Sequence, residues 1–573
     1  IDAGVDAVHK VNVPESWHNP APDAAPKALK GPDALVKQIR DVMEPISRMD
    51  GDSLPVSAFE GNVNGEWEQG ASAYEKRGTA VMVPEWDAEK CIQCNQCAFV
   101  CSHATIRPFC LTADEAANAP ESTKLADTKP KASEYKFTMA VSPLDCMGCG
   151  ECVTVCPTKA IEMKPQESQA AQQAAFDYCV ENIRKKDNIP GVVSDISVKG
   201  SQFNQPLLEF SGSCAGCAET SYARLITQLF GEKMFISNAT GCSSIWGGTA
   251  SISPYTTNKE SGFGPAWINS LFEDNAEHGL GMQIGYETVR ANLITKVEAL
   301  KGKNADLDAV IDKYLETKNN TKANDAPAKA LIAALEACGC DESKEILKDK
   351  QYLAKKSFWI FGGDGWAYDI GYGGLDHVLA SGHDVNVMVF DTEMYSNTGG
   401  QASKASNIGE VCQFAAAGKE ISKKSLAEIC MTYGYIYVAQ IALGANMAQA
   451  VKAIAEAEAY PGPSIIIGYA PCELHGVKGG MTNCQNEMKK AVEAGYWNLF
   501  TFNPALKAEG KNPFTLTSKA GKMDKYQEFL ANETRYSRLS RAFPDRAKAL
   551  FEKNQEAAEA RYTHLTKLVD LYK

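Results

Sequence analysis

Two short apolar runs in the middle of the chain, each followed by residues that suit a ligand site, restrict its fold more than any other feature. The run 358–361 is short enough for a buried parallel strand, and it breaks at Gly-Gly-Asp-Gly, residues 362–365. A helix is predicted around 375–379, and a second strand, 385–390, leads into Asp-Thr-Glu, residues 391–393. Because open α/β sheets bind ligands at the carboxyl ends of their strands, both loops are predicted to form one site.

The residues of these loops suit a divalent metal that holds a diphosphate. Gly363 and Gly365 let the backbone approach phosphate groups, while Asp364 and Thr392 offer the hard oxygen ligands that Mg²⁺ prefers. Gly-Asp-Gly alone is also an ordinary turn, and for the tripeptide by itself that alternative stays open. The full order of strand, Gly-Asp-Gly, helix, strand and Asp-Thr-Glu resembles the diphosphate-binding half of enzymes that use thiamine diphosphate (TPP).

Length and composition exclude several classes of protein. With 573 residues, 44% hydrophobic and 23% charged, the chain has the composition of a soluble globular protein of two or more domains. A net charge of −13 argues against nucleic-acid binding, and the absence of a run of about eighteen apolar residues argues against a membrane span. The chain starts at Ile1 without a signal peptide, so we expect it to begin inside a longer protein or after processing.

Nineteen cysteines are too many for an ordinary intracellular enzyme, and most fall in C-x-x-C groups, which indicate metal sites. The spacing C-x2-C-x2-C-x3-C occurs twice, as an internal repeat of a bacterial ferredoxin-type motif. The two copies are Cys91, Cys94, Cys97 and Cys101, and Cys146, Cys149, Cys152 and Cys156. The fourth cysteine of each copy is expected to open a helix and to ligate the cluster of the other copy.

Because of this crossing, one 4Fe–4S cluster is predicted on the first three cysteines of the first copy together with Cys156. The other cluster is predicted on the first three cysteines of the second copy together with Cys101. Cys101 is followed by Ser102 rather than by proline, which we expect to affect the turn more than the ligation. Zinc is the alternative metal, but zinc sites take their four ligands as two spaced pairs.

Three further cysteines, Cys214, Cys217 and Cys242, need a fourth ligand, for which we predict Cys472, just past an Ile-rich strand. Taken alone the three also fit structural zinc; beside two ferredoxin motifs and a TPP motif, a third 4Fe–4S cluster is favoured. For the C-x-C pair Cys338 and Cys340, a structural or incidental role is favoured over a redox role. The other cysteines are isolated and predicted to be buried small hydrophobes: Cys110, Cys179, Cys412, Cys430 and Cys484.

The chain is predicted to have three parts. Residues 1–78 form a linker and wrap-around segment, 79–165 a ferredoxin-like domain with two 4Fe–4S clusters, and 166–573 a TPP-binding α/β domain with a third cluster. The fold class is therefore α/β, a TPP-binding parallel sheet flanked by helices, with an inserted α+β bacterial two-cluster ferredoxin-like domain. Besides the two strands named above, strands are predicted at 233–237, 436–441 and 464–470.

Seven segments carry a resemblance to a known family: LPVSAF, YEKRGTAV, CIQCNQCAFVCSHATIRP, CAGCAETSYARL, NATGCSSIWGG, GPAWINSLFEDNAEHGLGM and DTEMYSNTGGQ. Together they resemble the pyruvate:ferredoxin (flavodoxin) oxidoreductases. The likeness runs from about Leu54 onward and matches the carboxyl-terminal half of the long single-chain form. The motifs are many, specific and ordered, so chance similarity is negligible.

The resemblance implies oxidative decarboxylation of pyruvate with coenzyme A (CoA) to acetyl-CoA and CO₂. Electrons would pass singly from a TPP adduct through three 4Fe–4S clusters to ferredoxin or flavodoxin, with Mg²⁺ holding TPP. The resemblance also implies a homodimer of the full enzyme in the cytoplasm of an anaerobe, with a hydrogenosome-like organelle as the other location. An acidic ferredoxin would need a basic docking patch, expected near Lys76, Arg77 or Arg107.

By the same resemblance, Mg²⁺ is expected on Asp364, Thr392 and the carbonyl oxygen of Met394. Asn397 is expected to face the reacting end of TPP as a catalytic residue, with a turn-forming asparagine before two glycines as the alternative.

The cluster of Cys214, Cys217, Cys242 and Cys472 is expected beside TPP, so that Cys242 is also a cofactor contact. Glu219, the second catalytic candidate, is expected to line the cofactor cavity. TPP enzymes need a carboxylate on the aminopyrimidine of the cofactor, and the family places substrate-binding residues in an amino-terminal domain that is absent here. We therefore expect the chain to need an amino-terminal partner half. The alternatives are an oxidoreductase for another 2-oxoacid and an electron-transfer module without TPP.

Overall fold

The computed structural model describes residues 2–18, 28–249, 251–302 and 305–573. The chain forms two compact units, residues 1–61 and 62–573. In the first unit, α3 (Asp33–Gln38) continues through a π-helical turn into α4 (Glu44–Ser47). The ligand-site residues predicted above all belong to the second unit.

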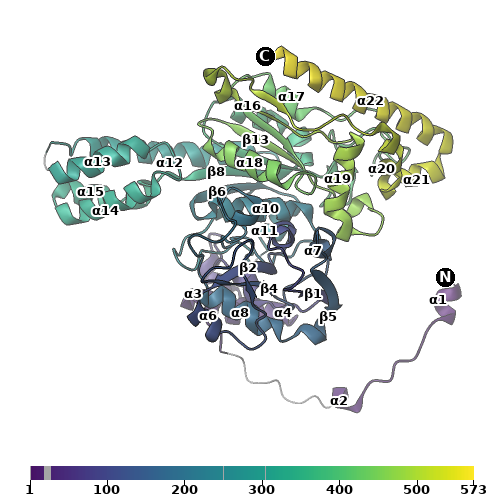
Figure 1. The fold of residues 1–573 in the computed structure, drawn as a ribbon, viewed down its shortest axis with the longest axis horizontal. Helices are drawn as coiled ribbons and strands as arrows, with labels where there is room; N and C mark the ends of the chain where they lie inside the picture. Colours follow the sequence, from purple (N-terminus) through teal and green to yellow (C-terminus); the bar gives the residue numbers. More distant parts are fainter. Residues whose placement is uncertain (1, 19–27, 250, 303–304) are drawn as a thin grey trace. The chain divides into compact units, whose positions relative to one another are not determined.

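An eight-stranded sheet forms the centre of the second unit, in the order β15-β14-β12-β13-β9-β8-β6-β7 (Figure 1). From β12 to β7 all neighbouring strands are parallel, while β14 and β15 extend the β12 edge in antiparallel pairing. The strands are β6 (Met234–Ala239), β7 (Ala266–Ser270), β8 (Ser357–Gly363), β9 (Asn386–Asp391), β12 (Tyr437–Ile441), β13 (Ser464–Tyr469), β14 (Phe500–Phe502) and β15 (Phe514–Leu516). The α/β class and all five predicted strands are confirmed.

The central strands are apolar on both faces because helices alternate with them along the chain. Every residue of β9 and β13 is buried, although successive side chains point to opposite faces of a sheet. One apolar cluster joins the strands to the covering helices, α10 (Ala218–Phe230), α12 (Asn275–Glu298), α16 (Tyr372–Ala380) and α18 (Met447–Ala459). The carboxyl ends of the central strands are thereby held rigidly at one edge.

A buried carboxylate joins α18 to the amino ends of β8 and β9. Glu458 Oε2 accepts hydrogen bonds from Ser357 Oγ (2.5 Å), Trp359 Nε1 (3.2 Å) and Asn386 Nδ2 (3.0 Å). Burial raises the pKa of Glu458 from its ordinary value of 4.5 to about 7. Between pH 4.5 and about pH 7, the Glu458 carboxyl keeps its proton in the folded chain but has released it in the unfolded chain.

Stability should therefore fall as pH rises through this window, because the unfolded state binds fewer protons. We expect Glu458→Gln to remove this slope and to stabilise the fold at about pH 8 by about 2 kcal/mol. Urea unfolding at about pH 5 and about pH 8 would measure both effects. A variant with the slope of the unmodified chain would contradict the assignment to Glu458.

The segment with the repeated cysteine motif forms two small antiparallel sheets. β1 (Met82–Trp86) pairs with β5 (Ile161–Pro165), and β4 (Lys136–Val141) pairs with both β2 (Ile106–Leu111) and β3 (Ala126–Asp127). Because β1 and β5 lie at the two ends of the segment, their pairing closes it into a domain.

The two motif copies each contain one short helix, α5 (Gln96–Val100) and α7 (Glu151–Thr154). Both helices end before the fourth cysteine, so the expectation that this cysteine opens a helix is wrong. Cys101 terminates α5 in an extended conformation, with φ −63° and ψ 110°. The chain must leave the helix at this point for the thiol to turn toward the other copy.

Helices α12 to α15 form an arm that projects from the sheet (teal in Figure 1). α13 (Ala305–Thr317), α14 (Asp325–Cys338) and α15 (Asp341–Leu347) share a small apolar core with the outer end of α12. The chain ends in a long helix, α22 (Pro544–Leu571). Within the described residues, no helix combines the length and the apolar character that a membrane crossing requires.

Candidate active site and cluster ligands

The two predicted loops meet at the carboxyl edge of the sheet. Asp364 follows β8 and Thr392 follows β9, its parallel neighbour. Thr392 donates to Asp364 Oδ1 from its backbone N at 3.1 Å. Its Oγ1 lies 2.8 Å from Asp364 Oδ1 and 3.0 Å from the carbonyl oxygen of Met394. Three oxygen ligands therefore converge, an arrangement suited to Mg²⁺ bound together with a diphosphate.

The carboxyl group of Asp364 is completely buried. Burial, followed by the charge of Asp391, raises the pKa of Asp364 to about 8. No basic side chain in the described part of the chain forms an ion pair with Asp364; its neighbours are hydroxyl and amide donors. A cation is what a desolvated carboxylate needs to stay ionised, so these residues fit a divalent ion.

Two residues that the sequence analysis did not single out complete this site. Ser403 Oγ donates to Asp364 Oδ2 at 2.5 Å. His475 Nε2 donates to the carbonyl oxygen of Thr392 at 2.7 Å, and burial lowers the pKa of His475 to about 3, so the ring is neutral. His475 comes three residues after Cys472, and that closeness is the signal that could have pointed to it.

Buried ion pairs hold the turn that follows β9. Lys423 Nζ pairs with Asp391 Oδ1 (2.8 Å) and with Glu393 Oε1 (3.1 Å). Arg535 Nη1 pairs with Glu393 Oε2 (2.8 Å). Glu393 has φ 60°, a left-handed conformation that few residues other than glycine adopt, and the two ion pairs stabilise it. The backbone on both sides of Thr392 is thereby fixed.

The two glycines of Gly-Asp-Gly have different surroundings. A Cβ on Gly365 would lie 2.6 Å from the ring of Tyr395, whereas a Cβ on Gly363 would meet nothing closer than the Phe390 carbonyl oxygen at 3.9 Å. The open space beside Gly363 is where a diphosphate can approach the backbone.

We expect Gly365→Ala to displace the Tyr395 ring and to lower the free energy of unfolding by about 1–3 kcal/mol. Gly363→Ala should change that free energy by less than about 0.5 kcal/mol. It should nevertheless weaken TPP binding, because its methyl group occupies the open space. Urea unfolding and TPP titration of both variants test this, and equal stability losses would contradict the difference in packing.

The first predicted ligand set, Cys91, Cys94, Cys97 and Cys156, lines a cavity of about 20 Å³. Burial, followed by the thiols of Cys94, Cys91 and Cys156, raises the pKa of Cys97. The structure thus brings together thiols from both motif copies, in the crossed grouping. Among the described residues, no three His, Cys, Asp or Glu side chains are arranged as ligands of a single metal ion; the four thiols of this set instead surround a cavity. Their ligation of a cluster stays a prediction.

The second set shows the same crossing. The pKa of Cys152 is raised by burial and then by Cys149, Cys146 and Cys101, three thiols of the predicted set. Cys101 is the member that comes from the first motif copy.

Backbone geometry repeats between the two copies as closely as the cysteine spacing does. In both copies, the backbone amide two residues after the first cysteine donates a hydrogen bond to the Sγ of that cysteine. Residues with left-handed backbone conformations also occur at matching positions. The amide contacts are Gln93 to Cys91 and Gly148 to Cys146, both 3.3 Å, and the left-handed pairs are Gln93 and Gly148, Asn95 and Gly150, and Ala104 and Lys159. Such N–H···S contacts tune the reduction potential of iron–sulfur clusters.

The third set also comes together, across the width of the sheet domain. The pKa of Cys242 is raised by burial, then by Glu219, and then by the Cys217, Cys472 and Cys214 thiols. Glu219 is buried, and Trp246 Nε1 donates to its Oε2 at 3.1 Å. Glu219 therefore lies beside these thiols, and its catalytic role stays a prediction.

The sites form a series. Ser396 Oγ donates to Thr392 Oγ1 at 2.8 Å and also lies next to the thiol of Cys472, so the third set adjoins the predicted Mg²⁺ site. Cys484 is completely buried and lies near both the third and the second set. Burial, then Glu151 and Cys217, and further Cys149 raise the pKa of Cys484. The second and first sets are neighbours too, since Cys97 contributes to the raised pKa of Cys152.

Asn397 lies on an exposed loop after β10 (Met394–Tyr395), followed by Gly399 and Gly400 in left-handed conformations. This position is compatible with a contact to the reacting end of TPP and with the turn alternative. Its catalytic role stays a prediction.

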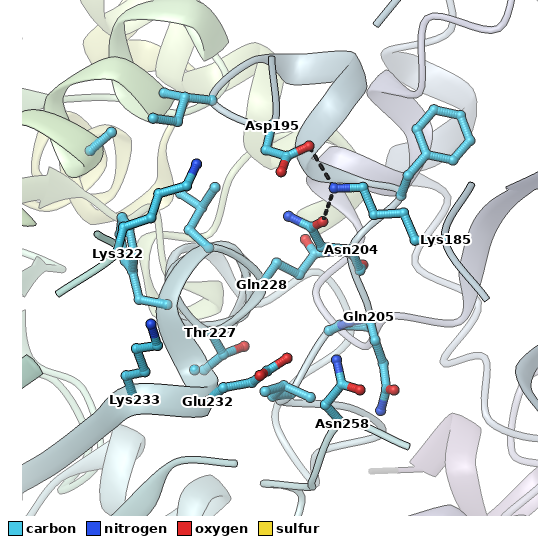
Figure 2. Close-up of a pocket in the computed structure, with 18 of the residues that line it drawn as sticks. Lys185, Asp195, Asn204, Gln205, Thr227, Gln228, Glu232, Lys233, Asn258 and Lys322 are labelled. Carbon is cyan, nitrogen blue, oxygen red and sulfur yellow. Dashed lines mark hydrogen bonds and ion pairs between the residues drawn. The ribbon is translucent and has the colours of Figure 1, made fainter. Parts of the chain in front are cut away.

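A larger cavity, of about 580 Å³, lies at the amino edge of the sheet, the opposite edge from the predicted TPP site. Figure 2 shows Lys185 in its wall, donating to Asp195 (2.6 Å) and to Asn204 (2.9 Å), with Lys322 on another side. Its lining includes none of the predicted cofactor ligands, so it is separate from the site above.

Three segments match known protein families. Residues 23–80 match EKR, a domain of unknown function; residues 90–160 match the 4Fe-4S dicluster domain; and residues 347–467 match the C-terminal TPP-binding domain of thiamine pyrophosphate enzymes. The last two contain the repeated cysteine motif and the two loops of the predicted Mg²⁺ site.

Relatives match over almost the entire chain. The pyruvate-flavodoxin oxidoreductase of Enterobacter agglomerans is 48% identical, over 99% of this chain and 48% of its own length. The pyruvate:ferredoxin oxidoreductase of Moorella thermoacetica is 48% identical, over 100% of this chain and 49% of its own length. A solved 2-oxoglutarate:ferredoxin oxidoreductase from Magnetococcus marinus, with TM-score 0.29, 15% identity and coverage of 46% of this chain and 64% of its own, is too distant to support an argument. The chain thus spans about half the length of these curated relatives, and along that half it is related in sequence to the pyruvate–flavodoxin/ferredoxin oxidoreductases.

Proposed function

We propose that this chain is the cofactor-bearing half of an enzyme that converts pyruvate and CoA to acetyl-CoA and CO₂ and passes the electrons singly to ferredoxin or flavodoxin. It acts together with the half of its relatives' length that it does not span, which supplies substrate-binding residues. The relatives' names, pyruvate-flavodoxin and pyruvate:ferredoxin oxidoreductase, support the substrate and the electron acceptors.

The observation that carries the proposal is the junction between the oxygen site and the third thiol set. Asp364, Thr392 and the Met394 carbonyl oxygen converge, and Ser396 connects Thr392 to Cys472. A metal–diphosphate site directly beside four thiols suits a reaction that must hand electrons from TPP to an iron–sulfur cluster.

The residues of this chain then have definite tasks. When bound, TPP supplies the electron sink for decarboxylation. Asp364, Thr392 and the Met394 carbonyl oxygen would hold Mg²⁺, and the backbone at Gly363 would leave room for the diphosphate. His475 and the ion pairs of Glu393 keep the Thr392 turn in place. Asn397 is the residue that we propose for contact with the reacting end of the cofactor.

The three thiol sets would each hold a 4Fe–4S cluster, and the bound clusters would supply a path for electrons that begins at the set containing Cys472. The set of Cys91, Cys94, Cys97 and Cys156 would be the last in this path, next to the electron carrier. Ile92, between two of its cysteines, is 50% exposed, so this end of the series is close to solvent and to a docking protein.

A docking patch was expected near Lys76, Arg77 or Arg107, but Arg107 is buried and paired with Glu209 and cannot contribute an exposed charge. Lys76 is paired with Asp145 at 2.5 Å, and Arg77 is paired with Glu75, so neither offers an unpaired charge. We propose the exposed face around Ile92 as the docking surface of the carrier. We also propose a homodimer of the full enzyme and a location in the cytoplasm of an anaerobe or in a hydrogenosome-like organelle.

The test is the content of iron, sulfide, zinc and TPP in one anaerobic sample, with low-temperature EPR after reduction. About twelve iron and one TPP per chain, with interacting 4Fe–4S signals, are expected. About eight iron, one zinc and no TPP would overturn the proposal and leave an electron-transfer module with a structural third site.

A further inference from the structure

The C-x-C pair on the helical arm brings two sulfur atoms together away from the sites described above. Cys338 is the last residue of α14, Gly339 terminates the helix in a left-handed conformation (φ 63°), and Cys340 is the N-cap of α15. This turn reverses the chain between the two helices and leaves Cys338 Sγ 3.2 Å from Cys340 Sγ.

Both thiols are engaged by polar groups of the α15 N-terminus. Ser343 N donates to Cys340 Sγ at 3.4 Å, and Ser343 Oγ lies 3.1 Å from the same sulfur. The side chain of Ser343 and the backbone and thiol of Cys340 lower the pKa of Cys338. A thiol in such surroundings is more often present as the nucleophilic thiolate.

Exposure separates this pair from the chain's other thiols. Cys338 is exposed and Cys340 is half-buried against the apolar core of the arm. Cys214 is exposed too, but it belongs to the third thiol set, and the isolated cysteines Cys110, Cys179, Cys412, Cys430 and Cys484 are all buried. A reagent in solution therefore reaches Cys338 first among the thiols that no cluster is predicted to use.

We propose that Cys338 and Cys340 are a redox-active dithiol that exchanges with dialkyl disulfides. The Cys338 thiolate attacks one sulfur of the disulfide, forming a mixed disulfide and releasing one thiolate. Cys340 then attacks the Cys338 sulfur, forming the Cys338–Cys340 bond and releasing the second thiolate. The protein pair is oxidised by two electrons, the disulfide is reduced to two thiols, and the two thiol protons pass to the released thiolates.

The geometry favours a reversible bond over a permanent one. The sulfur atoms must close from 3.2 Å to about 2.05 Å, and one residue separates the two cysteines, so the ring is small. Oxidation also removes the thiol that caps α15 at Ser343 N. A disulfide at this exposed position is readily reduced again, as expected for a pair that exchanges.

Glutathione disulfide is the probe for the test. The full chain, purified anaerobically with its clusters, is incubated with it, treated with an alkylating agent and digested with trypsin. Cleavage after Lys329 and Lys344 releases one peptide, residues 330–344, whose two cysteines are Cys338 and Cys340. We expect this peptide to lose two hydrogen atoms, to resist alkylation and to carry no glutathione.

Two single variants separate the roles of the thiols. Cys340→Ser should retain one glutathione on Cys338, because the resolving thiol is missing, whereas Cys338→Ser should react more slowly and never form the internal bond. Far-UV circular dichroism checks that both variants fold, and the unmodified chain alone already gives a decisive result. An unmodified peptide, or stable glutathione adducts on the unmodified chain, would overturn the proposal.

Discussion

Asp364→Asn should abolish the copurification of TPP and Mg²⁺ with this chain. The asparagine keeps the size of the side chain and an oxygen acceptor for Thr392, but it removes the charged oxygen ligand of the predicted metal site. Mutating a residue that only hydrogen-bonds to a metal ligand already lowers metal affinity by about 10–100-fold. Losing the ligand itself should therefore raise the Kd for Mg²⁺–TPP by at least about 100-fold, or about 2.7 kcal/mol.

The fold itself should survive this substitution, because the native protein already buries Asp364 at a cost. Asp369→Asn is the matched control: it makes the same chemical change five positions along the chain, where the carboxylate pairs with Lys404 at 2.8 Å rather than with the site. TPP content and isothermal titration with Mg²⁺–TPP should separate the two variants. If both bind normally, Asp364 does not hold the metal.

Paired cysteine substitutions should reveal which thiols share a cluster. Under the crossed assignment, Cys94 and Cys156 ligate the same cluster. The double variant Cys94→Ser, Cys156→Ser therefore damages one cluster, and about four iron atoms per chain are lost. Cys149→Ser with Cys156→Ser damages two clusters, and about eight iron are lost. If each motif copy held its own cluster, the two double variants would exchange these results.

Iron and sulfide analysis of anaerobic preparations measures this difference directly. Cys179→Ser is the control, since Cys179 is completely buried near the ferredoxin-like domain but belongs to no thiol set. It should keep the full iron content. Equal iron loss in the two double variants would exclude both arrangements.

The parts of the fold that the sequence predicted are those that local patterns encode. β9 and β13 are continuous apolar runs because helices cover both faces of the sheet. β7 was missed because three of its five residues are polar or small and most are at least partly exposed, so it has no apolar run. β14 and β15 have three residues each, too few for a periodic pattern to appear.

The prediction of the site from the sequence was limited to local patterns in the same way. The oxygen ligands and the cysteines occur in short motifs with fixed spacing, and the structure brings them together. Ser403 contacts Asp364, and Lys423 and Arg535 contact the turn after β9, each from a distant part of the chain, so no local spacing connects them to the site. Their roles depend on burial and on the left-handed conformation of Glu393, which only the folded chain defines.

The position of Cys472 sets an order of biosynthesis. Cys214 and Cys217 precede β6, but Cys472 follows β13, so the ribosome must make most of the chain and the central sheet must close before all four thiols meet. All eight thiols of the two ferredoxin-type sets have been made once the ribosome passes Cys156, so their predicted clusters can be inserted much earlier than the third. Under the proposed assignment, a fragment that ends before Cys472 would keep both ferredoxin-type thiol sets but would lack the fourth thiol of the set beside the predicted TPP site.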